Sequence, residues 1–63
     1  MQKFLRLNTV IQITGLSRST IYAFIKANKF PKQINLGERA VAWLESDISE
    51  WMDSKIKDAG FMK

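Results

Sequence analysis

The sequence predicts a mainly α-helical domain with a small β-hairpin, arranged as a winged helix-turn-helix. Three observations support this fold class: two short helical segments flank a turn at Gly15, residues 32–43 change to a period of two, and a longer helical stripe follows. Two short helices joined by a glycine-containing turn are typical of a helix-turn-helix unit. A chain of 63 residues can build one small core, so we expect residues 1–63 to form a single domain.

The first elements are short. We expect residues 1–6 to form a short extended lead-in. The apolar side chains expected to cover the core here are Phe4, Leu5 and Leu7. A first helix is predicted over about Thr9–Thr14, beginning at Asn8 or Thr9. Its apolar positions are Val10, Ile11 and Ile13. Gly15 ends it, because glycine tolerates the left-handed backbone found after many helices.

The second helix carries the strongest local signals. Ser17 is a favoured N-cap, and Leu16 and Ile21 have the spacing of a hydrophobic staple around it. One apolar stripe is predicted, at Ile21, Phe24 and Ile25. We expect the helix to end near Ala27-Asn28, with Asn28 as a left-handed cap. Pro31 then prevents continuation, and Phe30 is expected to attach the helix exit to the core.

Residues 32–43 alternate as two strands, which predicts a wing. Ile34 and Leu36 share one face of the first strand, and Val41 and Trp43 share one face of the second. A two-residue loop at Gly37-Glu38 would place Leu36 beside Arg39 and Ile34 beside Val41. A three-residue loop would shift this register by one residue, so the face of Arg39 stays open. A hairpin alone is unstable and must pack on the helices.

A third helix follows the wing. Ser46 is the expected N-cap, and Asp47 suits the positive end of the helix dipole. The predicted core stripe consists of Ile48, Trp51, Met52 and Ile56. Gly60 ends the pattern, and Phe61–Lys63 form a tail that is either frayed or bound to a partner.

The charge is unevenly distributed along the chain. Residues 1–39 carry +6 and residues 40–63 carry −2, which gives the net charge of +4. A basic front favours a polyanionic partner, although many small domains are modestly basic. Histidine and cysteine are absent, which excludes disulfides and zinc-finger ligands, and we expect no metal or cofactor. No apolar run approaches the about 20 residues of a membrane span, so we expect a cytoplasmic protein.

A basic, hydroxyl-rich first turn behind a tight turn is typical of a recognition helix that enters the major groove of DNA. The residues we expect to contact DNA are Ser17, Arg18, Ser19, Thr20, Tyr22, Lys26, Lys29, Lys32 and Arg39. Arg18 suits guanine or phosphate, the three lysines suit the backbone, and Arg39 suits a narrow minor groove. Each has an ordinary alternative: a solvated cation, extra capping at Ser19 and Thr20, a half-buried filler at Tyr22, or a surface pair of Arg39 with a nearby glutamate.

Two further groups have structural interpretations. We assign Trp43 and Trp51 to the core, because both fall on core stripes. The third helix carries Asp47, Glu50 and Asp53 on another face, which is a solvated face or a contact for a protein partner such as an integrase or RNA polymerase. Without a histidine, a cysteine or room for a pocket, we expect no enzyme activity.

The run Thr14–Tyr22, read TGLSRSTIY, and the wing residues Leu36-Gly37 and Arg39–Trp43 closely resemble the AlpA family of prophage regulators. The resemblance covers about residues 5–56 and implies a winged helix that binds specific DNA. It further implies activation of an integrase gene or, alternatively, an excisionase that bends attachment-site DNA. One departure is Asn8-Thr9, where relatives often have a proline followed by an acid.

A single domain of this size covers little DNA. We therefore expect a homodimer or a cooperative oligomer on double-stranded DNA, with Phe4-Leu5 or Phe61-Met62 as possible contacts between copies. The alternative of another class is a protein-interaction module that binds an acidic partner.

Overall fold

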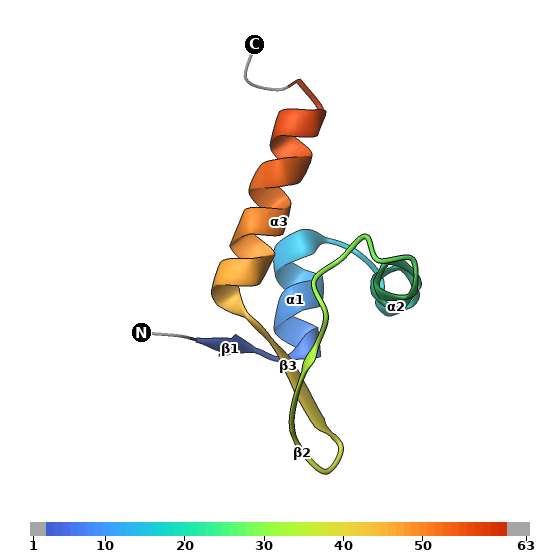
Figure 1. Cartoon of the computed structure of the whole chain (residues 1–63), viewed down its shortest axis with the longest axis vertical. Helices are drawn as coiled ribbons and strands as arrows, with labels where there is room; N and C mark the ends of the chain where they lie inside the picture. Colours follow the sequence, from blue (N-terminus) through green and yellow to red (C-terminus); the bar gives the residue numbers. More distant parts are fainter. Residues whose placement is uncertain (1–2, 61–63) are drawn as a thin grey trace.

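The computed structural model describes residues 3–60, which form three helices and a three-stranded antiparallel sheet (Figure 1). The elements in order are β1 (Phe4–Leu5), α1 (Leu7–Thr14), α2 (Arg18–Lys26), β2 (Ile34–Gly37), β3 (Ala40–Leu44) and α3 (Glu45–Asp58). This order of helix, turn, helix, hairpin and helix confirms the predicted fold class. The predictions made for Phe61–Lys63 lie outside the described residues.

The lead-in forms a strand, which the sequence did not predict. Strand β1 pairs with β3, with Phe4 opposite Leu44 and Leu5 opposite Trp43, so the sheet has the order β1-β3-β2. The Glu45 amide also donates to the Lys3 carbonyl at 2.8 Å. Since successive side chains of a strand point to opposite faces, Leu5 is buried while Phe4 is 49% exposed. The prediction that Phe4 covers the core is wrong.

Helix α1 begins at Leu7, two residues before the predicted Thr9. Its N-cap is Arg6, whose backbone is extended and whose carbonyl accepts from the Val10 amide at 3.0 Å, without a capping side chain. The end of β1 thus fixes the helix start. Gly15 ends α1 as predicted, with a left-handed φ of 75°. Val10 is fully buried, whereas Ile13 is 43% exposed and does not belong to the core.

Helix α2 has the predicted cap. The Ser17 hydroxyl accepts from the Thr20 amide at 3.2 Å and donates to Thr20 Oγ1 at 2.9 Å. Ile21 is fully buried, and Phe24 and Ile25 pack against the core at partial exposure. The helix ends at Lys26, and Asn28 adopts the expected left-handed conformation with φ of 61°.

The wing has a different register from the one derived for a Gly37-Glu38 loop. Ile34 pairs with Ala42, Asn35 with Val41 and Gly37 with Ala40, so the tip consists of Glu38 and Arg39. At the base of the hairpin, the pairs Ile34–Ala42 and Asn35–Val41 have the register expected for a three-residue loop. The pairing then shifts by one residue between Asn35 and Gly37, which leaves a two-residue tip. The Asn35 side chain accepts from the Gly37 amide at 2.9 Å within this irregularity.

Helix α3 starts at Glu45, directly after β3, with Leu44 as its N-cap and no capping side chain. The predicted cap Ser46 therefore lies inside the first turn. Because the chain passes from strand to helix without a loop, the position of β3 sets the helix start. Ile48 is buried and Met52 is partly buried as predicted. Ile56 is 42% exposed, because the second half of α3 extends past α1 (Figure 1).

Three aromatic residues connect the exit of α2 to the core. Phe30 is 6% exposed and packs edge-on against Trp43 and Trp51, with ring centroids 6.4 and 4.8 Å away. Trp43 is fully buried, and Trp51 is partly buried against the core. These contacts confirm the packing roles predicted for Phe30 and for both tryptophans.

Candidate nucleic-acid interface

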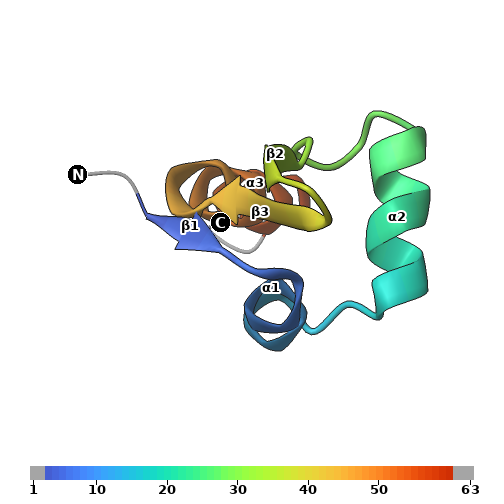
Figure 2. The same cartoon turned by 90° about the horizontal axis from the view of Figure 1, so that it is seen from below.

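A shallow groove brings together residues from the start of α1, the first half of α2 and the wing. We call it the arginine groove; its volume is about 470 Å³, and it is lined by Arg6, Leu7, Asn8, Arg18, Tyr22, Arg39 and Val41. Figure 2 shows α2 on one side of the molecule, facing the hairpin and α1. None of the seven lining residues is acidic, so three guanidinium groups share one surface without a neutralising carboxylate in the lining.

Each arginine is held by a different local structure. Arg18 is the first residue of α2, directly after the Ser17 cap, and Tyr22 lies one turn later on the same side of the helix. Arg39 is at the wing tip, where its backbone has a left-handed φ of 59°. Arg6 is the N-cap residue of α1. All three arginines are exposed, and Tyr22 is 37% exposed, so their polar groups are available to a ligand.

The chemistry of the arginine groove suits phosphates and the edges of bases. A guanidinium is planar, always charged and able to donate two parallel hydrogen bonds to a phosphate or to guanine. The first turn of α2 adds the positive end of the helix dipole and exposed backbone amides. A groove of this kind attracts a polyanion and can bind it with defined geometry.

The hydroxyl groups of this turn divide into two kinds. Ser17 and Thr20 hydrogen-bond to each other at the N-terminus of α2, which is the N-cap role predicted for Ser17 and the capping alternative considered for Thr20. Ser19 is exposed in the same turn, next to Arg18. Ser17 therefore has a demonstrated structural role, and Ser19 is the hydroxyl best placed to face a ligand.

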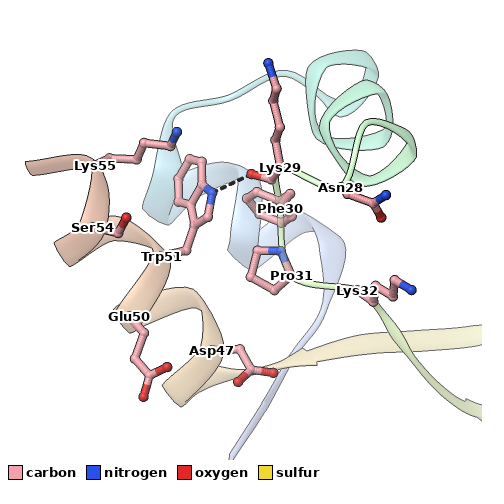
Figure 3. Close-up of a pocket in the computed structure, with 10 residues that line it drawn as sticks. All are labelled: Asn28, Lys29, Phe30, Pro31, Lys32, Asp47, Glu50, Trp51, Ser54 and Lys55. Carbon is pink, nitrogen blue, oxygen red and sulfur yellow. Dashed lines mark hydrogen bonds between the residues drawn. The ribbon is translucent and has the colours of Figure 1, made fainter. Parts of the chain in front are cut away.

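The structure does not place the three candidate lysines in the arginine groove. Lys29 and Lys32 line a second groove between residues 28–32 and α3 (Figure 3), which also contains Asp47 and Glu50. Lys26 is exposed in the last turn of α2. Most of the basic residues of the first 39 positions are thus divided between the arginine groove and a second groove of mixed charge.

Sequence reasoning missed Arg6 as a site residue. Its position before a helix does not indicate a DNA contact. Its closeness to Arg18 and Arg39 depends on how α1, α2 and the wing pack, which the sequence does not show. A basic residue immediately before the first helix was the available signal. Only the tertiary arrangement shows that its side chain lines the same groove.

Residues 3–60 contain no cluster of three or more histidine, cysteine or acidic side chains able to hold a metal ion. None of the helices in this range is both long and apolar enough to cross a membrane.

Comparison with known proteins identifies the family. The model of the family described as prophage CP4-57 regulatory protein (AlpA) matches residues 3–56. The chain is 47% identical over 55 residues to the uncharacterized protein ORF88 of Enterobacteria phage P4, covering 87% of this chain and 62% of that protein. It is 39% identical over 61 residues to the DNA-binding transcriptional activator AlpA of Escherichia coli (strain K12), covering 87% of each. The chain therefore belongs to the AlpA family of prophage regulatory proteins.

Proposed function

We propose that the protein is a sequence-specific DNA-binding transcriptional regulator of a prophage or related mobile element. Helix α2 lies in the major groove and the wing, β2 with β3, lies in the adjacent minor groove. The observation that carries this proposal is the arginine groove, where Arg6, Arg18 and Arg39 converge from three elements. The relationship to the E. coli activator AlpA, which is DNA-binding by its description, supports the same function.

Each groove residue has a distinct role in this proposal. Arg18, at the N-terminus of α2, reads a base edge, and Ser19 contacts the neighbouring base or phosphate. Arg39 inserts at the minor groove, and Arg6 and Tyr22 hold the phosphates between the two grooves. Lys26 contacts the backbone beyond the recognition turn. Lys29 and Lys32 contribute to the overall field more than to direct contacts, because acidic residues share their groove.

The test is a fluorescence-anisotropy titration at several salt concentrations. The probes are the promoter and attachment-like repeats near the gene, and a scrambled duplex. We expect at least a ~10³-fold preference for one native probe. Arg18→Ala should lower affinity for that probe most. Arg6→Ala should weaken binding to all probes and reduce the slope of log affinity against log salt by about 0.9, the value for one phosphate.

The matched control is Lys57→Ala, which removes the same charge from an exposed position near the end of α3. It should leave affinity and salt slope near those of the wild type. Equal losses for the Lys57 and Arg6 variants would mean that net charge, not the arginine groove, drives binding. Absence of binding to every probe at low salt would refute the DNA-binding function and favour a protein partner.

The regulatory step is the finer part of the proposal. We propose activation of integrase expression, tested with a reporter fused to the integrase promoter. Loss of activation in the Arg18→Ala variant, at unchanged protein level, is the expected result. A native site inside an attachment sequence, with bending of the bound DNA and no promoter response, would instead identify an excisionase.

A further inference from the structure

Two indole groups, one on β3 and one on α3, hydrogen-bond to the segment that follows α2. Trp43 Nε1 donates to the Pro31 carbonyl at 3.0 Å, and Trp51 Nε1 donates to the Lys29 carbonyl at 2.8 Å. Trp43 is fully buried in the sheet and has an evident core role. Trp51 is different, because it lies on α3 and is only partly buried.

The Trp51 ring is fixed by its surroundings. It packs edge-on against Phe30 at 4.8 Å with an interplanar angle of 65°, and the Lys55 ammonium lies 5.6 Å from its centroid. Figure 3 shows the indole nitrogen directed at the Lys29 carbonyl, so that α3 and the end of α2 are joined across the groove. Both partners are rigidly attached: Trp51 to a helix, and Lys29 to the Phe24 carbonyl through its own amide at 2.8 Å.

Helix α2 has few other constraints on its direction. One face packs on the core through Ile21, Phe24 and Ile25, and the turn at Gly15 fixes its start. The far end is fixed by the left-handed Asn28 and by the segment that the two indoles hold. A helix supported along one face can pivot about that face unless both ends are tied, so the Trp51 bond limits the pivot.

The arginine groove depends on this direction. Arg18 and Tyr22 are carried by α2, whereas Arg39 is carried by the wing and Arg6 by α1. A change in the angle of α2 changes the spacing of the guanidinium groups, while their number and charge stay the same. Sequence-specific binding requires the correct spacing, whereas non-specific binding requires only the charge.

We infer that Trp51 is a positioning residue for DNA recognition: its indole N–H ties the exit of α2 to α3 and so sets the angle between α2 and the wing. The inference rests on the proposed function. It predicts a loss of discrimination between DNA sequences when the N–H is removed. The expected size is about fivefold, the factor by which one net hydrogen bond of ordinary strength changes an equilibrium.

The test compares Trp51→Phe with the wild type. Phenylalanine keeps an aromatic ring against Phe30 but has no N–H donor. Lys55→Met is the matched control, since it removes the neighbouring cation and leaves the Trp51 bond in place. Affinities for the native and scrambled probes are measured at a temperature where circular dichroism shows all three proteins to be folded. Under that condition a residue with only a structural role leaves the affinity ratio unchanged.

A second readout needs no DNA. The sequence has no cysteine, so spin labels can be attached at Ala23→Cys on α2 and Glu38→Cys at the wing tip, both exposed positions. Electron–electron double resonance then gives the distribution of distances between α2 and the wing. We expect a broader or shifted distribution for Trp51→Phe and an unchanged one for Lys55→Met.

The two readouts separate the possible failures. An unchanged distance distribution in Trp51→Phe overturns the positioning role, whatever the DNA data show. A changed distribution with an unchanged affinity ratio overturns its importance for recognition. A wild-type protein that binds no native probe refutes the proposed function and with it the recognition role, while the distance data still test the tie to α3. A changed distribution together with a reduced ratio supports the inference.

Discussion

Replacing Arg39 by glycine should make the protein more stable and a weaker DNA binder. Arg39 has a φ of 59°, a conformation that costs an L-residue roughly 1–2 kcal/mol and glycine almost nothing. Glycine also lowers the stability by roughly 0.5–1 kcal/mol, because it gives the unfolded chain more conformational freedom. Arg39 is exposed at the wing tip, so little packing is lost. The net gain is about 0.5 kcal/mol, equivalent to a melting temperature higher by roughly 3 °C in a domain of this size.

The same substitution removes a guanidinium from the arginine groove. For native DNA we expect about a tenfold loss of affinity, because the guanidinium no longer enters the minor groove, and a shallower dependence of log affinity on log salt, because one cation fewer faces the DNA. Thermal unfolding followed by circular dichroism and anisotropy titrations at three salt concentrations measure the two effects. Arg39→Ala is the control: it loses the same side chain but keeps the left-handed strain, so affinity should fall equally with no gain in stability.

Two results would refute this reasoning separately. A glycine variant with a lower melting temperature than the alanine variant would show that the wing tip is not strained in solution. Unchanged DNA affinity in both variants would show that Arg39 does not contact DNA.

Other predictions concern the fold. Gly15→Ala should lower the free energy of unfolding by about 1 kcal/mol in a urea titration, because a φ of 75° is strained for alanine even though its Cβ would meet no atom within 4 Å. An unchanged stability would contradict the left-handed turn. Ser17→Ala should lower stability by about 1 kcal/mol through the lost cap, while the affinity of the folded variant for DNA stays constant; a lower affinity would reveal a DNA contact of the hydroxyl. Trp43→Phe should cost about 2 kcal/mol by thermal unfolding, from the cavity and the lost bond to Pro31, and a neutral result would argue against a fully buried indole.

The features predicted correctly depend on neighbours in sequence. Ser17 as a cap, Gly15 and Asn28 as left-handed residues, and the stripe through Ile21 follow from rules that act within one or two helical turns. The packing role of Trp43 follows from strand alternation in the same way. Local rules therefore sufficed for the fold class and for the cap and the core-facing stripe of α2.

The wrong predictions concern features whose structure depends on residues far away in the sequence. Strand β1 is only two residues long and has its partner about forty residues away, so its sequence alone carries no strand signal. Ser46 matches a capping rule, but α3 starts at Glu45 because β3 leads straight into it. The wing has an irregular register between Asn35 and Gly37 and an arginine in the left-handed conformation at its tip, and residue propensities favour neither feature.

The candidate site shows the same division. Arg18, Tyr22 and Arg39 were singled out by residue type and position, and all three line one groove. Arg6 was missed, and Lys29 and Lys32 line a different groove, since only the packing of α1, the wing and α3 separates these surfaces. Whether the grouped residues contact DNA is a prediction that the binding experiments above will test.

The pairing of β1 with β3 has a consequence for the order of folding. Phe4 meets Leu44 and Leu5 meets Trp43, so the sheet joins the beginning of the chain to a strand made near its end. During synthesis α1 and α2 leave the ribosome before their sheet exists, and each is too short to persist alone. Folding therefore waits until β3 and the first half of α3, which carries the buried Ile48, have emerged, and closing one long loop then brings β1 onto β3. Such a domain folds as one cooperative unit, and deleting β1 should unfold α2 and the wing together rather than fray one end.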